Sequence, residues 1–318
     1  MENARDDDEV CGYYQGGKTK AAVIVKCNRF DWRCSPVGTF TLNGKRYRLE
    51  PTDSLPEATH FVKEMHRDER DLDIHGDEQL IPEYPQSSGQ NITAMIANVG
   101  LNETHRRLKR MIPAGEDIIE IYIFADDSIY TRFLDLHGDK NTTIKMIREY
   151  YLEICNEMDM HFQQIKDANR KGVDIRIYFK GIHVALDSTG APWSIRAMDS
   201  LKTVNSSTAL DIFSAWQKQF RTYNFLRYHL AMAVTGQKIG GTMVGRTWFA
   251  SMCFADSHYH ASIIEDRGNF LAMDAVHELG HFLSAMHDPT SGNCSNGYIM
   301  AASFHTAIGI NQHKFSTC

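Results

Sequence analysis

Two histidines separated by three residues, His277 and His281, constrain the fold of this chain more than any other feature. Their segment contains no proline and reads Leu-Ala-Met-Asp-Ala-Val-His-Glu-Leu-Gly-His from Leu271. Residues four apart on a helix project from one face, one turn apart, so both imidazoles should point into the same space. A third histidine, His287, follows six residues after His281, so the chain must leave the helix and turn back to bring all three together.

The three histidines have the spacing of a metal site. Imidazole nitrogens bind Zn²⁺ at about 2.0–2.1 Å, and three protein ligands leave a position for water, which is typical of a catalytic zinc site. Glu278 lies one step round the helix, where it can act as general base on that water. A bare His-Glu-x-x-His also fits an ordinary helix with surface histidines, but His287, Asp288 and the downstream Tyr298-Ile-Met favour the zinc site.

The run from His277 to Asp288, followed by Ile-Met300, resembles the metzincin zinc endopeptidases. Asp288 points to their reprolysin branch, which includes adamalysins, snake-venom metalloproteases and ADAM catalytic domains. The resemblance covers nearly the whole chain, because the segments that begin at Cys11 and Asn43 resemble the reprolysin propeptide. Within this branch the chain also resembles short tick salivary reprolysins.

The resemblance implies an α/β fold: a metzincin-type catalytic domain with a mixed twisted sheet, long helices and a zinc cleft, preceded by a mainly β propeptide. It implies one zinc ion with three ligands, His277, His281 and His287. Glu278 is then the catalytic base, and Met300 is the Met-turn residue beneath the metal. Strand 258–265 is expected to be the sheet edge along which an extended peptide substrate pairs.

Two residues depart from the family pattern. Ser284 stands where the family has glycine, at the point where the chain leaves the helix. A non-glycine residue in left-handed backbone geometry costs about 1–2 kcal/mol there and could displace His287. Tyr298 stands where venom enzymes have a cysteine before Ile-Met, so one family disulfide cannot form.

Hydrophobic periodicity predicts a β-rich start and an α/β remainder. Asn43-Gly44 predicts a tight hairpin turn in the first part. Further strands are expected over 118–124, 173–179, 229–234 and 258–265. Helices are expected over 141–171, over 206–223 with Ser or Thr at its cap, and over 269–283.

A basic run separates the two parts. Arg107-Leu-Lys-Arg110 fits the cleavage pattern of proprotein convertases, and the alternative is a solvated helix end or linker. We therefore expect a propeptide over 1–110 and a reprolysin-like catalytic domain over 111–318, with a convertase cutting after Arg110. The cysteine that usually blocks zinc before this site is missing, and Cys34 is a candidate substitute.

Composition excludes some classes of protein and favours secretion. The net charge of −6 argues against a nucleic-acid-binding protein, and no apolar run is long enough to span a membrane. The N-terminus lacks a signal peptide and by itself indicates the cytosol. Seven cysteines and five glycosylation sequons instead favour a secreted chain whose signal is absent from the sequence. The sequons are at Asn91, Asn102, Asn141, Asn205 and Asn293.

The cysteine pairing remains partly open. Four cysteines in the second part allow three full pairings. The resemblance implies Cys253–Cys318, which leaves Cys155 and Cys294 either joined or unpaired. In the first part, Cys11–Cys27 is the expected pair.

The sequence thus predicts a secreted zymogen of a zinc metalloendopeptidase that cleaves extracellular proteins. The alternative is a catalytically weak, zinc-containing protein that binds an extracellular host protein, which only Ser284 favours. His258 and His260 alternate as if on one strand face, and we interpret them as polar edge residues rather than a second metal site. A Ca²⁺ site involving Glu120 is possible for this family, but no ligand set is assignable.

Overall fold

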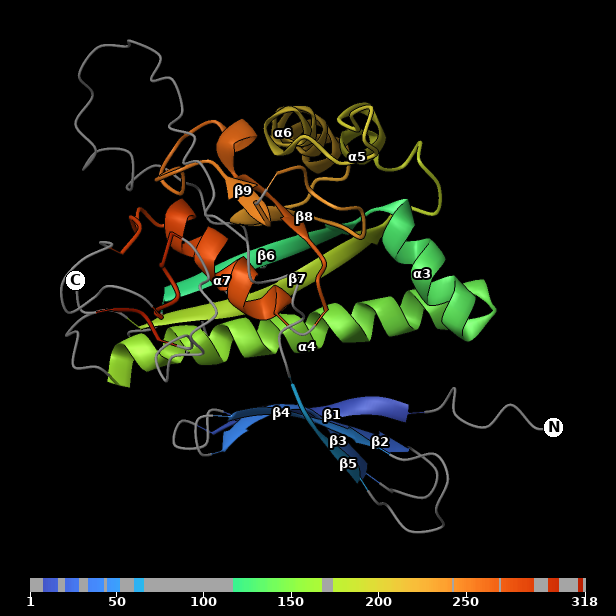
Figure 1. Ribbon diagram of the computed structural model, residues 1–318, viewed down its shortest axis with the longest axis vertical. Helices are drawn as coiled ribbons and strands as arrows, with labels where there is room; N and C mark the ends of the chain where they lie inside the picture. The colour runs from blue at the N-terminus through green and yellow to red at the C-terminus, as the bar shows by residue number, and fades with distance from the viewer. Residues whose placement is uncertain are drawn as a thin grey trace.

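The computed structural model describes residues 8–16, 21–28, 34–42, 45–51, 60–65, 117–167, 174–241, 243–268, 270–288, 297–302 and 314–316. These residues form two five-stranded sheets, an antiparallel N-terminal sheet and a second sheet that lies among helices (Figure 1). The expected α/β architecture, with a β-rich N-terminal part, is therefore present.

The N-terminal sheet is a meander in which each strand pairs antiparallel with the next. Its strands are β1 (Asp8–Gly16), β2 (Ala21–Asn28), β3 (Cys34–Leu42), β4 (Lys45–Pro51) and β5 (His60–Glu64). The pairing of Leu42 with Lys45 leaves two residues between β3 and β4. This is the connection length that Asn43-Gly44 predicts.

The second sheet has the strand order β7-β6-β8-β10-β9. Its strands are β6 (Asp117–Ala125), β7 (Ile175–Val184), β8 (Leu230–Thr235), β9 (Gly245–Thr247) and β10 (Ala261–Glu265). Only β9 runs against its neighbour; the other pairings are parallel. The predicted strand at 258–265 begins later than expected, because Ser257–Tyr259 form a short 3-10 turn, η2.

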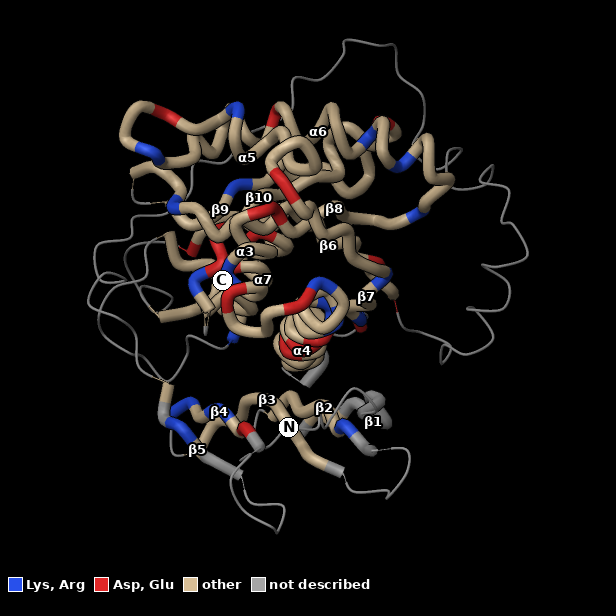
Figure 2. Tube along the Cα trace, turned by 90° about the vertical axis from the view of Figure 1, so that its right-hand side faces the viewer, with Lys and Arg blue, Asp and Glu red and all other residues tan. Residues whose placement is uncertain are grey.

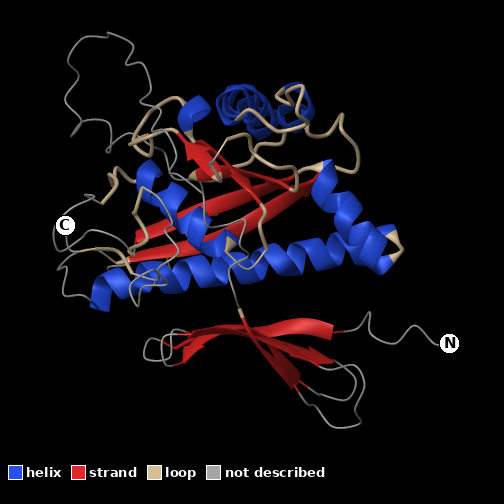
Figure 3. Cartoon of the chain, in the orientation of Figure 1, coloured by secondary structure: helices blue, strands red, loops and turns tan. Residues whose placement is uncertain are grey.

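Helices cover both faces of this sheet (Figure 3). They are α3 (Asp127–His137), α4 (Lys140–Asp167), α5 (Pro192–Arg196), α6 (Ser206–Tyr223) and α7 (Leu271–Phe282). Alternation along β6 separates the two cores: Ile121 and Ile123 pack with α3, α4 and α7, whereas Phe124 packs with α5 and α6. The sheet is therefore buried on both sides, and α7 lies in the same layer as α4.

The three predicted helices are confirmed where the structure describes them, with one correction. Helix α6 has the predicted bounds, but its cap is Asn205 rather than Ser or Thr. The Asn205 side chain accepts a hydrogen bond from the Thr208 amide at 3.0 Å. Asparagine caps as well as serine because its short side chain also carries an oxygen that reaches the first turn.

The N-terminal sheet packs against the side of α4 that faces away from the second sheet (Figure 2). Helix α4 thus lies between the two sheets and contacts β1 and β2 on one side and β7 and α7 on the other. Within the described residues, no helix combines the length and apolarity needed to cross a membrane.

Candidate metal centre

Helix α7 supplies two of the three predicted ligands from the interior of the protein. All twelve of its residues are buried, including His277 and His281. It packs on α4, β10 and β9, so it is held by tertiary contacts rather than by a side-chain cap, which its N-terminus lacks. Two buried imidazoles on a helix held in this way have little freedom to reorient.

The chain leaves α7 at Ser284, as the sequence predicts. Ser284 has a φ of 78°, in the left-handed region. The Ser284 amide donates to the His281 carbonyl at 3.0 Å, and the Ala285 amide donates to the Gly280 carbonyl at 2.8 Å. These two bonds are those of the Schellman motif that commonly ends helices at a glycine. Ser284 therefore adopts the glycine geometry, and the turn brings His287 back towards the helix.

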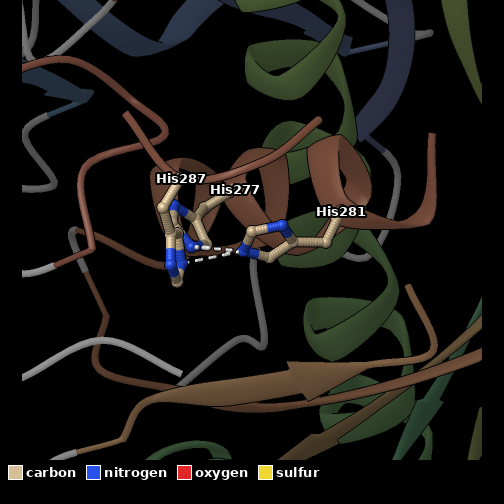
Figure 4. A group of neighbouring side chains, drawn as sticks. All are labelled: His277, His281 and His287. Carbon is tan, nitrogen blue, oxygen red and sulfur yellow. Dashed lines mark hydrogen bonds between the residues drawn. The ribbon is translucent and has the colours of Figure 1, made fainter. Parts of the chain in front are cut away.

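Three imidazole nitrogens converge at this point (Figure 4). The His281 Nε2 lies 3.0 Å from the His277 Nε2 and 3.0 Å from the His287 Nε2. One ligand atom from each of the three residues lies within 4.8 Å of the other two. A tetrahedral zinc ion with bonds of about 2.0–2.1 Å would separate its ligand nitrogens by about 3.3 Å. The spacing thus fits a single shared ion.

Backbone carbonyls orient two of the rings. The His277 Nδ1 lies 2.6 Å from the Ile299 carbonyl oxygen, and the His281 Nδ1 lies 2.7 Å from the Ala285 carbonyl oxygen. Because a carbonyl oxygen carries no proton, each Nδ1 must be the donor, and the neutral ring then presents a lone pair at Nε2. Two lone pairs 3.0 Å apart repel unless a cation lies between them. The donor set therefore fits zinc.

Glu278 belongs to the same helix but lies to one side of the histidines. Its side chain is buried and faces β9, where a Cβ added to Gly245 would lie 2.6 Å from the Glu278 Oε1. Only a glycine lets the strand approach this closely. The glutamate is not among the three residues whose ligand atoms converge, so its role as a base rather than a ligand stays a prediction.

The Met300 segment packs beneath the helix. Met300 is buried, and a Cβ added to Gly280 would lie 2.5 Å from its sulfur. The Met300 carbonyl accepts a hydrogen bond from the Asp288 amide at 2.8 Å, and the Asp288 carboxylate accepts one from the Ser316 hydroxyl. This short segment thus supports both ends of the ligand set: Ile299 orients His277, and Met300 anchors the residue after His287.

Sequence reasoning missed Gly245 and Gly280. A signal was present for Gly280, because an interior helical glycine costs about 1 kcal/mol relative to alanine and needs a packing reason. No local signal identified Gly245, since its partner Glu278 lies 33 positions away in the sequence.

The prediction that 258–265 forms the edge strand of the sheet is wrong. Strand β10 lies between β8 and β9, so 258–265 does not form the sheet edge. Among the described strands, β9 forms the edge beside the histidine cluster, and its Arg246 pairs with Ile263 of β10. A three-residue strand has too short a pattern to be recognised from sequence, and strand order depends on pairings distant in the chain.

The remaining polar candidates have structural roles. His258 belongs to η2 and His260 follows it, so they do not share a strand face. The His260 Nε2 lies 3.0 Å from the Phe254 carbonyl oxygen, and burial lowers the pKa of His260 to about 4. Glu120 forms an ion pair with Lys180 at 2.7 Å, so this carboxylate is already neutralised and the expectation of calcium gains no support.

Cys155 and Cys253, the two cysteines whose side chains the structure describes, are not joined in a disulfide. Cys155 is buried, and burial raises the pKa of its thiol to about 12; Cys253 is exposed. Cys294 and Cys318 lie outside the described residues, so the Cys253–Cys318 pairing stays a prediction. The backbone register places Cys27 opposite Cys34, but the side chains of the N-terminal cysteines are not described, so Cys11–Cys27 also stays a prediction.

The fold and the site together define an α/β protein in which one helix and the turn that follows it bring three histidines into a candidate metal centre. The chain belongs to Metallo-peptidase family M12, of the reprolysin type, whose family model matches residues 116–316.

Two curated relatives come from Naja atra. The chain is 26% identical over 313 residues to the zinc metalloproteinase-disintegrin-like protein kaouthiagin-like, and 26% identical over 315 residues to the zinc metalloproteinase-disintegrin-like protein atrase-B. Each match covers 96% of this chain and 45% of the relative, so the chain spans less than half the length of these relatives. A solved structure titled "Structure of a chaperone-substrate complex" aligns with 64% of this chain and 30% of its own, at a TM-score of 0.40 and 13% identity.

The strain at Ser284 leads to a stability prediction. Changing Ser284→Gly should stabilise the protein by about 1 kcal/mol, because glycine adopts the left-handed geometry without a steric cost. For a domain of about 200 residues this corresponds to a rise in Tm of about 2–4 °C. Ser284→Ala is the matched control and should give no rise, since alanine meets the same steric cost. Equal Tm values for the glycine and alanine variants would contradict the prediction.

Proposed function

We propose that the chain is the precursor of a secreted zinc metalloendopeptidase that hydrolyses internal peptide bonds of extracellular proteins. The observation that carries the proposal is the convergence of three Nε2 atoms. In two of the rings, His277 and His281, Nδ1 donates to a backbone carbonyl, so Nε2 presents a lone pair. Glu278 lies on the same helix as these two histidines. The test is peptide hydrolysis by the processed protein with and without a chelator. Loss of hydrolysis in chelator and its return with added zinc is the expected result, and chelator-insensitive hydrolysis would contradict the proposal.

The residues of the site have distinct roles in this proposal. His277, His281 and His287 hold the zinc ion, which when bound polarises the scissile carbonyl and lowers the pKa of a water molecule. Glu278 takes the proton from the attacking water and transfers it to the leaving amine. Met300 supports the ligand set from below and does not touch the reacting atoms.

The substrate strand is proposed to lie along β9. An extended peptide can add to an unpaired sheet edge through main-chain hydrogen bonds. Within the described residues, β9 pairs with β10 on only one side, and Gly245 brings this edge into contact with Glu278. The scissile bond would thereby be held beside both the general base and the ligand set.

The contact between Gly245 and Glu278 predicts that a single methyl group should impair catalysis. Changing Gly245→Ala places a Cβ 2.6 Å from the Glu278 Oε1, so the carboxylate must shift. We expect kcat/KM to fall by at least about 10-fold, since displacing a catalytic group by about 1 Å can cost 10²-fold. Zinc content, measured by mass spectrometry, should be unchanged.

The control for this variant is Gly236→Ala. A Cβ at Gly236 would lie 2.8 Å from the Ser128 Oγ, so that site is similarly crowded but lies away from the histidines. We expect Gly236→Ala to lower Tm without reducing the activity of the folded enzyme. A similar loss of activity in both variants would mean that Gly245 acts through general stability rather than by positioning Glu278.

We also propose maturation by a proprotein convertase after Arg110, with a propeptide over 1–110 and a catalytic domain over 111–318. The cleavage site lies outside the described residues. Support comes from the separate sheet at 8–64 and from β6, which begins at Asp117 and so would stay intact after a cut at Arg110. N-terminal sequencing of processed protein tests the boundary, and a first residue inside β6 would contradict it.

Secretion is supported by the two sequons that the structure describes. Asn141 and Asn205 are both exposed. The Asn205 side-chain oxygen caps α6, which leaves its amide nitrogen, the atom that is glycosylated, directed away from the cap. The other three sequons lie outside the described residues.

The rival function is a catalytically weak binding protein, and in the sequence alone only Ser284 favours it. The Ser284 turn nevertheless keeps the His287 Nε2 3.0 Å from the His281 Nε2. This feature therefore no longer favours the rival.

A further inference from the structure

Helix α4 carries a row of carboxylates on the face that meets the N-terminal sheet. Glu149, Glu153 and Glu157 are spaced four residues apart, so they lie one turn above another on the same side of the helix. Glu153 and Glu157 are buried, and the Glu149 side chain is only 14% exposed. A solvated helix face would leave such residues in water, so this face of α4 is a covered surface.

Basic residues of the N-terminal sheet form ion pairs with each of these three glutamates. Lys26 of β2 pairs with Glu149, and Arg46 of β4 pairs with Glu157. Arg48 of β4 forms the central pair: its two terminal nitrogens donate to the two oxygens of Glu153 at 2.9 and 3.2 Å. Two parallel bonds of this kind match the planar fork of arginine to a carboxylate.

The rest of the contact surface follows the alternation of the strands. Ala22 and Ile24 precede Lys26 at two-residue spacing and are buried, whereas Val62 on β5 is 55% exposed. The Thr39 hydroxyl donates to Glu157 at 3.1 Å. One face of the sheet is thus apolar at its centre and basic around it, and it complements α4 in both respects.

We propose that the acidic face of α4 is a protein-binding site separate from the metal centre, and that it keeps the N-terminal sheet bound after the connection to the catalytic part is cut. The proposal rests on the proposed function only in assuming that the chain is processed. The partner that fits this site is a β-sheet with both apolar and basic residues on one face. The chain's own N-terminal sheet is such a sheet, and we propose that it is the partner. The site lies on the side of α4 opposite to α7, so its occupancy can be measured without reference to catalysis.

The test uses the full chain in a Glu278→Gln background, which prevents self-digestion. A recognition sequence for a site-specific protease replaces residues 107–110, the chain is cut, and the fragments are separated by size-exclusion chromatography. We expect the two fragments to elute together. Arg48→Glu should separate them, because removing one partner of a buried ion pair weakens an interface by on the order of 10²–10³-fold. Combining Arg48→Glu with Glu153→Arg should restore co-elution.

Lys45→Glu provides the matched control. Lys45 is exposed on β4 and comes one residue before Arg46, so alternation places it on the opposite face of the strand from Arg46 and Arg48. The same charge reversal there should leave the fragments together. Circular dichroism and zinc content of each uncut variant show whether it has folded. If a reversal variant does not fold, Arg48→Met paired with Glu153→Met replaces it, and this apolar pair should retain co-elution while Arg48→Met alone weakens it. Separation of the cut parent fragments, or co-elution that charge reversal does not change, would overturn the proposal.

Discussion

Replacing Glu278 by glutamine should reduce peptide hydrolysis by about 10²–10⁴-fold while zinc content stays at one ion per chain. The amide of glutamine has the shape of the carboxylate, so the packing against Gly245 is kept, but it cannot accept the proton of the attacking water. Because Glu278 is not among the converging ligand residues, the metal should be retained. The measurements are kcat/KM on a peptide library and the zinc-to-protein ratio.

Asp135→Asn is the control for this variant. Asp135 is exposed on α3, and its change to the amide removes the same unit of charge without touching the metal centre. Its activity should match that of the parent. Substantial hydrolysis by Glu278→Gln at full zinc occupancy would show that another group serves as the base.

The second large effect concerns the metal itself. Changing His281→Ala should abolish zinc binding, and with it hydrolysis. Of the three proposed ligands, His281 is the one whose Nε2 lies 3.0 Å from both other Nε2 atoms. Its replacement removes the ligand nitrogen that lies close to both of the others, and it leaves a void beside a fully buried helix. We therefore expect a lower Tm as well, and no rise in Tm when zinc is added, because a ligand stabilises only the state that binds it.

His258→Ala tests whether this effect is specific. His258 lies in η2, outside the histidine cluster, and should be replaceable with zinc content and zinc-dependent Tm unchanged. If His281→Ala keeps one zinc ion per chain with parental affinity, the three histidines are not the ligand set, and the proposed metal centre is wrong.

Features that depend on local spacing could be predicted from the sequence. The four-residue interval between His277 and His281 implies a shared helix face because a helix has 3.6 residues per turn. The six-residue interval between His281 and His287 implies that the chain leaves the helix between them. The resemblance, which has glycine at position 284, placed the left-handed turn there, and the observed φ of 78° at Ser284 confirms it. The bounds of α6 follow from its apolar periodicity in the same way.

Other features depend on which segments meet in space, and only the tertiary structure decided them. In the part of the chain that the structure describes, β9 rather than 258–265 forms the sheet edge, because strand order is set by pairing between distant segments. The carbonyl oxygens of Ile299 and Ala285 determine which ring nitrogen of His277 and His281 carries the proton. Every residue has a backbone carbonyl, so the sequence does not indicate which of them will meet a histidine.

Helix α4 shows both kinds of information in one element. Its apolar periodicity predicted a long helix, and Tyr151 and Met158 lie in the core as that pattern requires. The glutamates on its opposite side have the spacing of an ordinary solvated face, yet Glu153 and Glu157 are buried against Arg48 and Arg46, about 100 positions earlier in the chain. Periodicity states which side of a helix is apolar, because that depends only on residues one turn apart. What covers the other side is decided by long-range packing, which no local spacing encodes.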